Sequence, residues 1–168
     1  MAYSQPVPTG FLPTTTRVAI DWLKTIPGLP AEQINTALPT TQDGAVNYEP
    51  WVEHGFVQVG IGAGGGPMMD LPVNEPVVTL TCWAASLHSK KPQWGKANDL
   101  AVVIIHATYE RRFLGPIATR PGYEDVRVFS AYATGDPLEV QGESSHHVGY
   151  EFDLALRWVR DPAPRGQR

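Results

Sequence analysis

The chain has 168 residues, a formal net charge of −4 at pH 7, 42% hydrophobic residues and a single cysteine. This length favours one domain, and the composition is that of an ordinary globular protein. The acidic balance and the lack of a Lys/Arg run argue against tight binding to nucleic acid. One cysteine excludes an internal disulfide and fits a reducing compartment.

The two ends of the chain carry no targeting or membrane pattern. The N-terminus lacks the basic segment and apolar core of a signal peptide, and no apolar run approaches the roughly 20 residues that span a bilayer. We therefore expect a protein that begins in the cytoplasm and has no membrane partner. The pattern predicts an extended N-terminal arm at 1–13, one domain at 14–160 and a flexible C-terminal tail at 161–168.

The first predicted element is a helix within residues 14–28. Val18, Trp22 and Ile26 recur at i, i+4 and i+8, the threonines before them offer an N-cap, and the Pro27-Gly28 pair should end the helix. Residues 28–54 are rich in Pro, Thr, Asn and Asp and hold at most a short strand. Two strands follow at 55–62 and 77–86, where β-branched and aromatic residues are enriched.

A second helix is predicted after Pro92, which suits a first helical turn. Its apolar positions follow a spacing of three, four, three and four residues: Trp94, Ala97, Ala101, Ile104 and Thr108. After a loop at 114–125, strands are predicted at 126–134 and 147–159. The even positions of the last strand, from Val148 to Trp158, are apolar and should face the helices.

The predicted order is therefore α-β-β-α-β-β. Strands joined without an intervening helix are expected to be antiparallel. This order indicates an α+β domain in which two helices pack on one face of a mainly antiparallel four-stranded sheet, with long Gly/Pro loops.

The stretch "VGIGAGGGPM" matches a dinucleotide-binding fingerprint through Gly60, Gly62 and Gly65. Such a fingerprint needs a helix that begins within the glycines, and Pro72 and Pro76 would interrupt one. No Lys-Ser/Thr pair follows, so a phosphate-binding Walker loop is excluded. The stretch is interpreted as a long hairpin loop, and no cofactor is predicted.

The remaining reactive residues indicate no enzyme. Cys82 lies among apolar strand residues, where cysteine behaves as a small hydrophobe. His146 and His147 are neighbours, and neighbouring side chains on an extended chain point to opposite faces. No third metal ligand lies at a recognisable spacing, so we expect both histidines to face solvent or an interface. His54 and His88 flank strands and have no evident partners, and Asp70 and Glu75 are loop carboxylates whose pairing depends on geometry. His106 and Glu110 are expected to form an ordinary surface pair, and Arg111 and Arg112 end a helix, where the dipole favours cations. A small hydrolase that uses Cys82, or a metal at His146, His147 and Glu143, stays open as an alternative.

Four segments together carry a resemblance to a known family: "VAIDWLKTIPGL", "FVQVGIGAGGG", "TLTCWAAS" and "KPQWGKANDLAVVIIHATYE". Their order resembles that of the tail terminator proteins of long, non-contractile-tailed (siphovirus-type) phages of actinobacteria, over roughly residues 14–159. The most specific part is a strand ending in Cys-Trp-Ala before a Lys-Ala-x-x-Leu-Ala helix: Cys82, Trp83, Ala84, Lys96, Ala97, Leu100 and Ala101.

The resemblance implies a structural virion protein of the neck that assembles in the host cytoplasm. It implies a ring of six subunits that caps the tail tube, ends tube elongation and meets the head connector or stopper protein. Genomic DNA would pass through the lumen without specific binding, and the family implies neither catalysis nor a cofactor. Another neck or tail component, such as a head-completion protein or a tube subunit, is the alternative.

The glycine stretch then needs a reason other than nucleotide binding. Glycines permit backbone shapes closed to other residues, clustered apolar residues mark contact surfaces, and methionine adapts to irregular partners. We expect this loop to lie against a neighbouring subunit or the tail tube. The predicted interface residues are Gly64, Gly65, Gly66, Met68, Met69 and Leu71.

Overall fold

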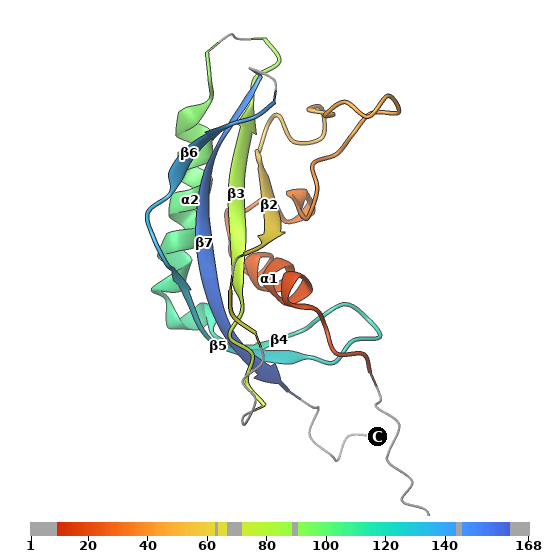
Figure 1. Cartoon of the computed structure of the whole chain (residues 1–168), viewed down its shortest axis with the longest axis vertical. Helices are drawn as coiled ribbons and strands as arrows, with labels where there is room; N and C mark the ends of the chain where they lie inside the picture. Colours follow the sequence, from red (N-terminus) through yellow and green to blue (C-terminus); the bar gives the residue numbers. More distant parts are fainter. Residues whose placement is uncertain (1–9, 63, 67–71, 89–90, 144–145, 162–168) are drawn as a thin grey trace, which may run out of the picture.

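A computed structural model describes residues 10–62, 64–66, 72–88, 91–143 and 146–161. It consists of one long, curved sheet with two α-helices (Figure 1). The helical elements of this part of the chain are α1 (Thr15–Leu23), η1 (Ala31–Gln33), α2 (Trp94–Thr108) and η2 (Arg111–Phe113). The strands are β1 (Ile34–Asn35), β2 (Phe56–Ile61), β3 (Val77–Ala85), β4 (Gly115–Ile117), β5 (Val126–Ala133), β6 (Leu138–Gln141) and β7 (His147–Arg160).

The sheet corrects the predicted fold. Within the described residues it has seven strands in the order β1-β2-β3-β7-β5-β4, with β6 also paired to β7. The pairing of β1 with β2 is parallel and the others are antiparallel, so the sheet is mixed. The prediction of a four-stranded antiparallel sheet in the order α-β-β-α-β-β is therefore wrong. The three missed strands are two to four residues long, too short to show a burial period.

The 14-residue strand β7 organises the sheet. On one side it pairs with β3 along its upper two thirds, from Ala85↔His147 to Val77↔Ala155. On the other side β5 and β6 follow one another along the same edge, β5 against residues 154–160 and β6 against residues 148–151. Strand β7 therefore lies inside the sheet, with β3 along one edge and β5 and β6 along the other.

Both helices contribute to a single buried cluster with one face of the sheet, here called the helix face. Most even positions of β7 lie in it as predicted: Phe152, Leu154, Leu156 and Trp158 are buried, and Tyr150 packs against the cluster. Val148 is also buried but is not part of this cluster. A buried hydrogen bond of 2.9 Å from Trp22 Nε1 of α1 to the Phe113 carbonyl of η2 connects the two helical regions.

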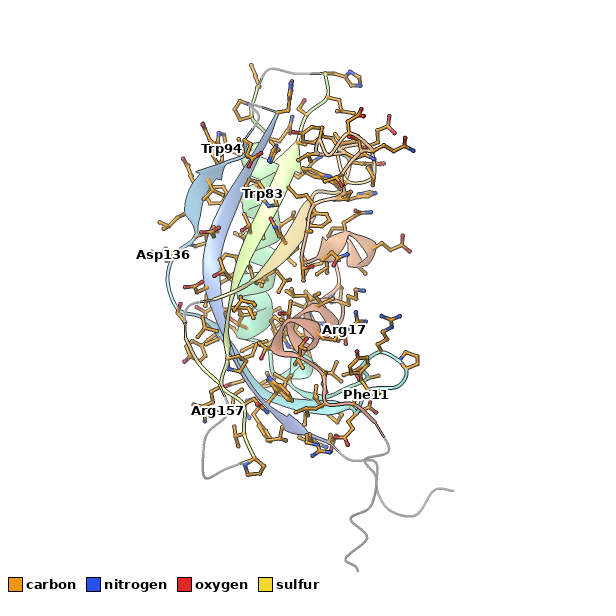
Figure 2. The ribbon with its side chains drawn as sticks, turned by 45° about the vertical axis from the view of Figure 1, so that its right-hand side comes forward. Phe11, Arg17, Trp83, Trp94, Asp136 and Arg157 are labelled. Carbon is orange, nitrogen blue, oxygen red and sulfur yellow. The ribbon has the colours of Figure 1, made fainter. Side chains whose placement is uncertain are left out.

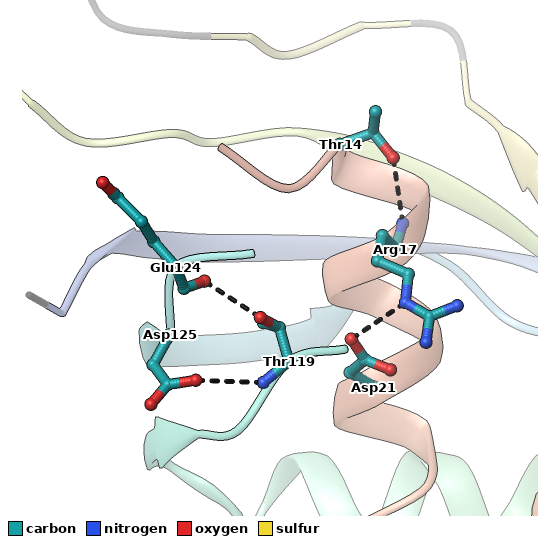
Figure 3. Close-up of polar contacts among 6 residues, drawn as sticks. All are labelled: Thr14, Arg17, Asp21, Thr119, Glu124 and Asp125. Atoms are coloured by element: carbon teal, nitrogen blue, oxygen red, sulfur yellow. Dashed lines mark hydrogen bonds and ion pairs between the residues drawn. The ribbon is translucent and has the colours of Figure 1, made fainter. Parts of the chain in front are cut away.

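The helix ends partly match the prediction. Thr14 caps α1, because its hydroxyl accepts a hydrogen bond from the Arg17 amide at 3.3 Å (Figure 3). The helix ends at Leu23, one turn before the Pro27-Gly28 pair that we expected to end it. In α2 the N-cap is Gln93, so Pro92 precedes the helix instead of occupying its first turn.

Candidate interaction site

The glycine loop, defined as residues 62–76, connects β2 to β3 as the predicted antiparallel hairpin. Gly65 has a φ of 75°, and a Cβ atom there would lie 2.1 Å from the Glu75 carbonyl oxygen. A Cβ atom on Gly62 would lie 2.6 Å from the Val77 carbonyl oxygen. These glycines are therefore required by the close approach of two backbone segments, which explains them without a nucleotide.

The part of the loop that leads into β3 pairs with β7 and so adds to the sheet. Asn74 and Trp158 exchange two backbone hydrogen bonds of 2.9 Å, and Glu75 forms an ion pair with Arg157. The base of the loop is thus fixed at one end of β7. Of the predicted interface residues, Gly64 and Gly65 are exposed and Gly66 is partly buried. The other three lie outside the described residues, so the predicted contact stays a prediction for them: Met68, Met69 and Leu71.

Ile61, at the start of this loop, is an apolar residue that the sequence reasoning missed as a contact candidate. It ends β2 and is 89% exposed. The alternating strand pattern does not mark Ile61 as exposed, and the residue that it pairs with, Val78, is fully buried.

A second apolar group lies where the described chain begins, at the end of the molecule that also carries β4 (Figures 1 and 2). Phe11 forms a parallel β-bridge with Tyr123, through hydrogen bonds of 3.0 Å to the Gly122 carbonyl and 2.9 Å from the Glu124 amide. The Phe11 side chain is 74% exposed, and Leu12 beside it is 51% exposed.

The turn that receives Phe11 is held by polar contacts. The Thr119 amide donates to the Asp125 carboxylate at 3.2 Å, and its hydroxyl donates to the Glu124 carbonyl at 3.0 Å (Figure 3). The Glu124 carboxylate also pairs with Arg160, and this hydrogen bond lowers the pKa of Glu124. These contacts hold the turn in place, and the turn holds the backbone of Phe11.

The side of the sheet opposite the helices is here called the open face. Its centre is polar: the Thr79 hydroxyl donates to Asp153 at 2.7 Å, and the Thr81 hydroxyl donates to Glu151 at 3.1 Å. The odd positions of the two predicted strands carry this signal, since they alternate with the apolar core positions. The sequence analysis placed the even positions of the last strand against the helices and assigned no role to the odd positions.

One end of the open face is covered by a second, smaller cluster. Trp51 and Phe56 are buried there, and Trp83 packs against them (Figure 2). His147 is also buried, and its Nδ1 lies 3.0 Å from the Tyr48 hydroxyl. Burial lowers the pKa of His147, because the charged ring would lose its hydration.

The two adjacent histidines therefore differ. His146 is exposed, as expected, but His147 is 4% exposed, so the expectation that both face solvent or an interface is wrong for His147. The strand reverses the side chain at each residue, and the covering segment of residues 36–54 encloses one of the two. No local pattern indicates that this segment folds back over the sheet.

Cys82 is fully buried in the main core, which confirms the structural interpretation. Burial raises the pKa of its thiol, so the nucleophilic thiolate is disfavoured. Within the described residues, no group of three His, Cys, Asp or Glu side chains could hold a metal ion. These findings offer no support for hydrolase chemistry at Cys82 or at the histidine pair.

The surface residues singled out in the sequence have ordinary environments. Glu110, which we expected to pair with His106, forms its ion pair with Arg112, whose guanidinium lies 4.8 Å from the centre of the Phe113 ring. The remaining histidines, His54, His88 and His106, are exposed, and Asp70 lies outside the described residues.

None of the helices in the described part of the chain has the length and apolar character needed to cross a membrane. No family model matches the sequence, and no curated protein matches it. Among solved structures, the chain is similar to one from the "virion of native gene transfer agent (GTA) particle", with 10% identity over 83% of this chain and 84% of that chain. The TM-score is 0.45, which is too low for this likeness to carry an argument about fold or function.

Proposed function

We propose that the chain is a structural virion protein of the tail terminator type. Six copies form a ring that caps the finished tail tube, ends its elongation and joins it to the head connector. The resemblance at Cys82-Trp83-Ala84 and in the following helix supports this proposal. Its partners are further copies of itself, the tail tube protein and the head connector or stopper protein.

The observation that carries the proposal is that the reactive side chains are buried whereas large apolar side chains are exposed. The reactive side chains Cys82 and His147 are buried and serve packing. By contrast, large apolar side chains are exposed at loops and strand ends, among them Phe11 and Ile61. Because exposed apolar side chains that lie together, as Phe11 and Leu12 do, mark contact surfaces, this distribution fits an assembly protein better than an enzyme.

The open face suits passage of DNA without retention. Glu151 and Asp153 place negative charge on it, and a protein that neutralises few phosphates releases few counterions on DNA contact. We propose that this face lines the lumen of the ring. The purified protein should not retain duplex DNA at about 150 mM salt in a gel-shift assay. Micromolar retention there would contradict the lumen assignment and favour a DNA-binding role.

The glycine loop provides the test of assembly. Met68→Asp combined with Met69→Asp should leave a folded monomer with a nearly unchanged melting temperature and abolish rings and tail joining. Met68→Leu combined with Met69→Leu is the matched control, because it keeps the apolar surface. Sedimentation velocity, circular dichroism and negative-stain images of reconstituted tails provide the measurements.

Three results would count against the proposal. Loss of the monomer fold in the aspartate variant would make the loop part of the core. Normal rings and tails with that variant would remove the loop from the interface. Labelled protein found along the whole tail, instead of at its head-proximal end, would identify a tube subunit.

A further inference from the structure

We propose that residues 5–9 of one copy add as a strand to the outer edge of β6 in a neighbouring copy. The inference rests on the self-association part of the proposed function and assigns its donor and acceptor segments. The donor precedes the described residues, and the acceptor is a strand whose outer edge lacks a partner strand within the described part of the chain.

The donor segment is chemically one-sided. In an extended chain, the backbone groups of alternate residues point to the same edge, so Gln5, Val7 and Thr9 share one edge and Pro6 and Pro8 share the other. Proline has no N–H, so the second edge cannot continue a ladder. A strand of this sequence can therefore join a sheet through its odd positions and leave an outer edge that recruits no further strand.

The described chain already uses the odd edge. Phe11 donates its N–H to the Gly122 carbonyl at 3.0 Å and accepts from the Glu124 amide at 2.9 Å. If the extended backbone at Phe11 continued toward the N-terminus, residues 9, 7 and 5 would lie on the same edge. The proposed pairing thus uses the same alternate set of residues that the structure shows paired at Phe11.

The strand that pairs with Phe11 cannot extend this ladder within the same subunit. The pairing is parallel, so it would continue from Gly122 to the residues before it. The next acceptor in this register is the Arg120 carbonyl, which already accepts a hydrogen bond from the Tyr123 amide at 3.1 Å in a turn. The proposal therefore assigns the pairing edge of residues 5, 7 and 9 to another copy.

The acceptor is β6. It has four residues without proline, whereas β1 has two residues and β4 contains Pro116. The Gly142 amide bonds to the His147 carbonyl at 3.1 Å, and this bond sets the phase of the ladder. By alternation, Glu139 and Gln141 then direct their backbone N–H and C=O groups outward, away from β7.

Exposed apolar surface lies beside this edge. Leu138 pairs with Glu151 and Tyr132 pairs with Ala155, so both side chains are on the open face. They are 70% and 57% exposed. An added strand that presents Val7 on this face would cover part of this surface, and its backbone would satisfy the outward groups of β6.

The position of the two segments favours a neighbouring copy over the same chain. Phe11 lies toward one end of the molecule and β6 lies along its other half (Figures 1 and 2). Val7 is four residues from Phe11, so even fully extended it lies within roughly 14 Å of it. The arrangement joins two different surfaces of the chain, so it is a head-to-tail contact, the kind from which rings are built.

Backbone-selective variants test the proposal. Val7→Pro removes an N–H from the donor edge, and Gln141→Pro removes an outward N–H from β6; Val7→Thr and Gln141→Ala are the matched controls. Sedimentation velocity over a concentration series should show at least a tenfold weaker association for each proline variant. The controls should associate like the unmodified chain, and all four should keep its melting temperature.

Crosslinking identifies the occupant of the edge. A Val7→Cys chain mixed with a Leu138→Cys chain should form a disulfide-linked pair, whereas Glu32→Cys, beyond the opposite edge of the sheet, should not. Cys82 is buried and stays in place. A Val7→Cys, Leu138→Cys chain that crosslinks only within itself would overturn the proposal, because the segment would then bind its own subunit.

The outcomes also separate this inference from the proposed function. Rings that form normally with both proline variants would overturn the strand exchange and leave the ring standing. An unmodified chain that stays monomeric at every concentration, and in the presence of tail tubes, would overturn both. Loss of melting temperature in Gln141→Pro would show that residue 141 faces β7 and would refute the assigned phase of β6.

Discussion

The two faces of the β3–β7 pair differ although the same two strands form them. On the helix face, Leu80 and Phe152 are paired and buried under the helices. One residue further along, Thr79 and Asp153 are paired on the open face and joined by a hydrogen bond of 2.7 Å. The comparison teaches that strand alternation in the sequence reports which face is covered, because a side chain reverses direction at each residue.

The open face itself differs along its length. At one end Trp83 packs on Gly149, where a Cβ atom would lie 2.8 Å from the indole ring, and its Nε1 donates to Gln58 at 2.9 Å. The segment of residues 36–54 covers this end and buries Trp51. Toward the other end the threonine and carboxylate pairs are uncovered. A single face thus carries a satellite core and a polar surface.

The largest expected effect tests the two faces directly. Leu154→Asp places a carboxylate at a fully buried position and should unfold the domain, at a cost of several kcal/mol. Asp153→Leu lies on the open face, breaks one hydrogen bond and should cost about 1 kcal/mol. Urea unfolding of both variants provides the measurement. Equal destabilisation would contradict the assignment of the faces.

An intermediate effect is expected at the covered end of the open face. Trp51→Ala removes a fully buried indole from the satellite core and should cost about 3–5 kcal/mol in unfolding free energy. The exposed Tyr132→Ala is the control and should stay within about 0.5 kcal/mol. Hydrogen exchange should accelerate around residues 46–56 in the Trp51 variant. Unchanged exchange there would show that the segment is held by other contacts.

The smallest effect is a pH dependence at His147. Burial depresses the pKa of His147 below its ordinary value of 6.5, so the unfolded chain binds this proton more readily than the folded chain. The stability contribution is therefore fully present above about pH 6.5 and is lost as the pH falls from there toward the depressed folded pKa.

Melting temperatures measured from pH 7.5 to pH 5 would test this dependence. His147→Gln keeps an acceptor for the Tyr48 hydroxyl but does not titrate, so its melting temperature should fall less over this range. Neighbouring Glu143 and His146 also act on His147, with opposite signs, and are unchanged in the comparison. Identical slopes for the two proteins would refute the assignment to His147.

The long elements and the main core could be predicted from local sequence patterns. The spacing of Val18 and Trp22 in α1, and the alternation along β7, appear in the structure as buried stripes. The interpretation of the glycine run as a hairpin and of Cys82 as a core residue also followed from neighbouring residues alone. These features are local, because a period of 3.6 or 2 can be recognised within one element.

The strand order of the sheet and the small cluster on its open face depend on contacts between distant segments. The strands β1, β4 and β6 are too short to carry a period and form where β2, β5 and β7 offer free edges. The burial of His147 depends on residues 36–54, which lie about 100 positions earlier in the chain. Pairing and cover between distant segments arise from packing of the whole chain, so no local pattern could reveal them.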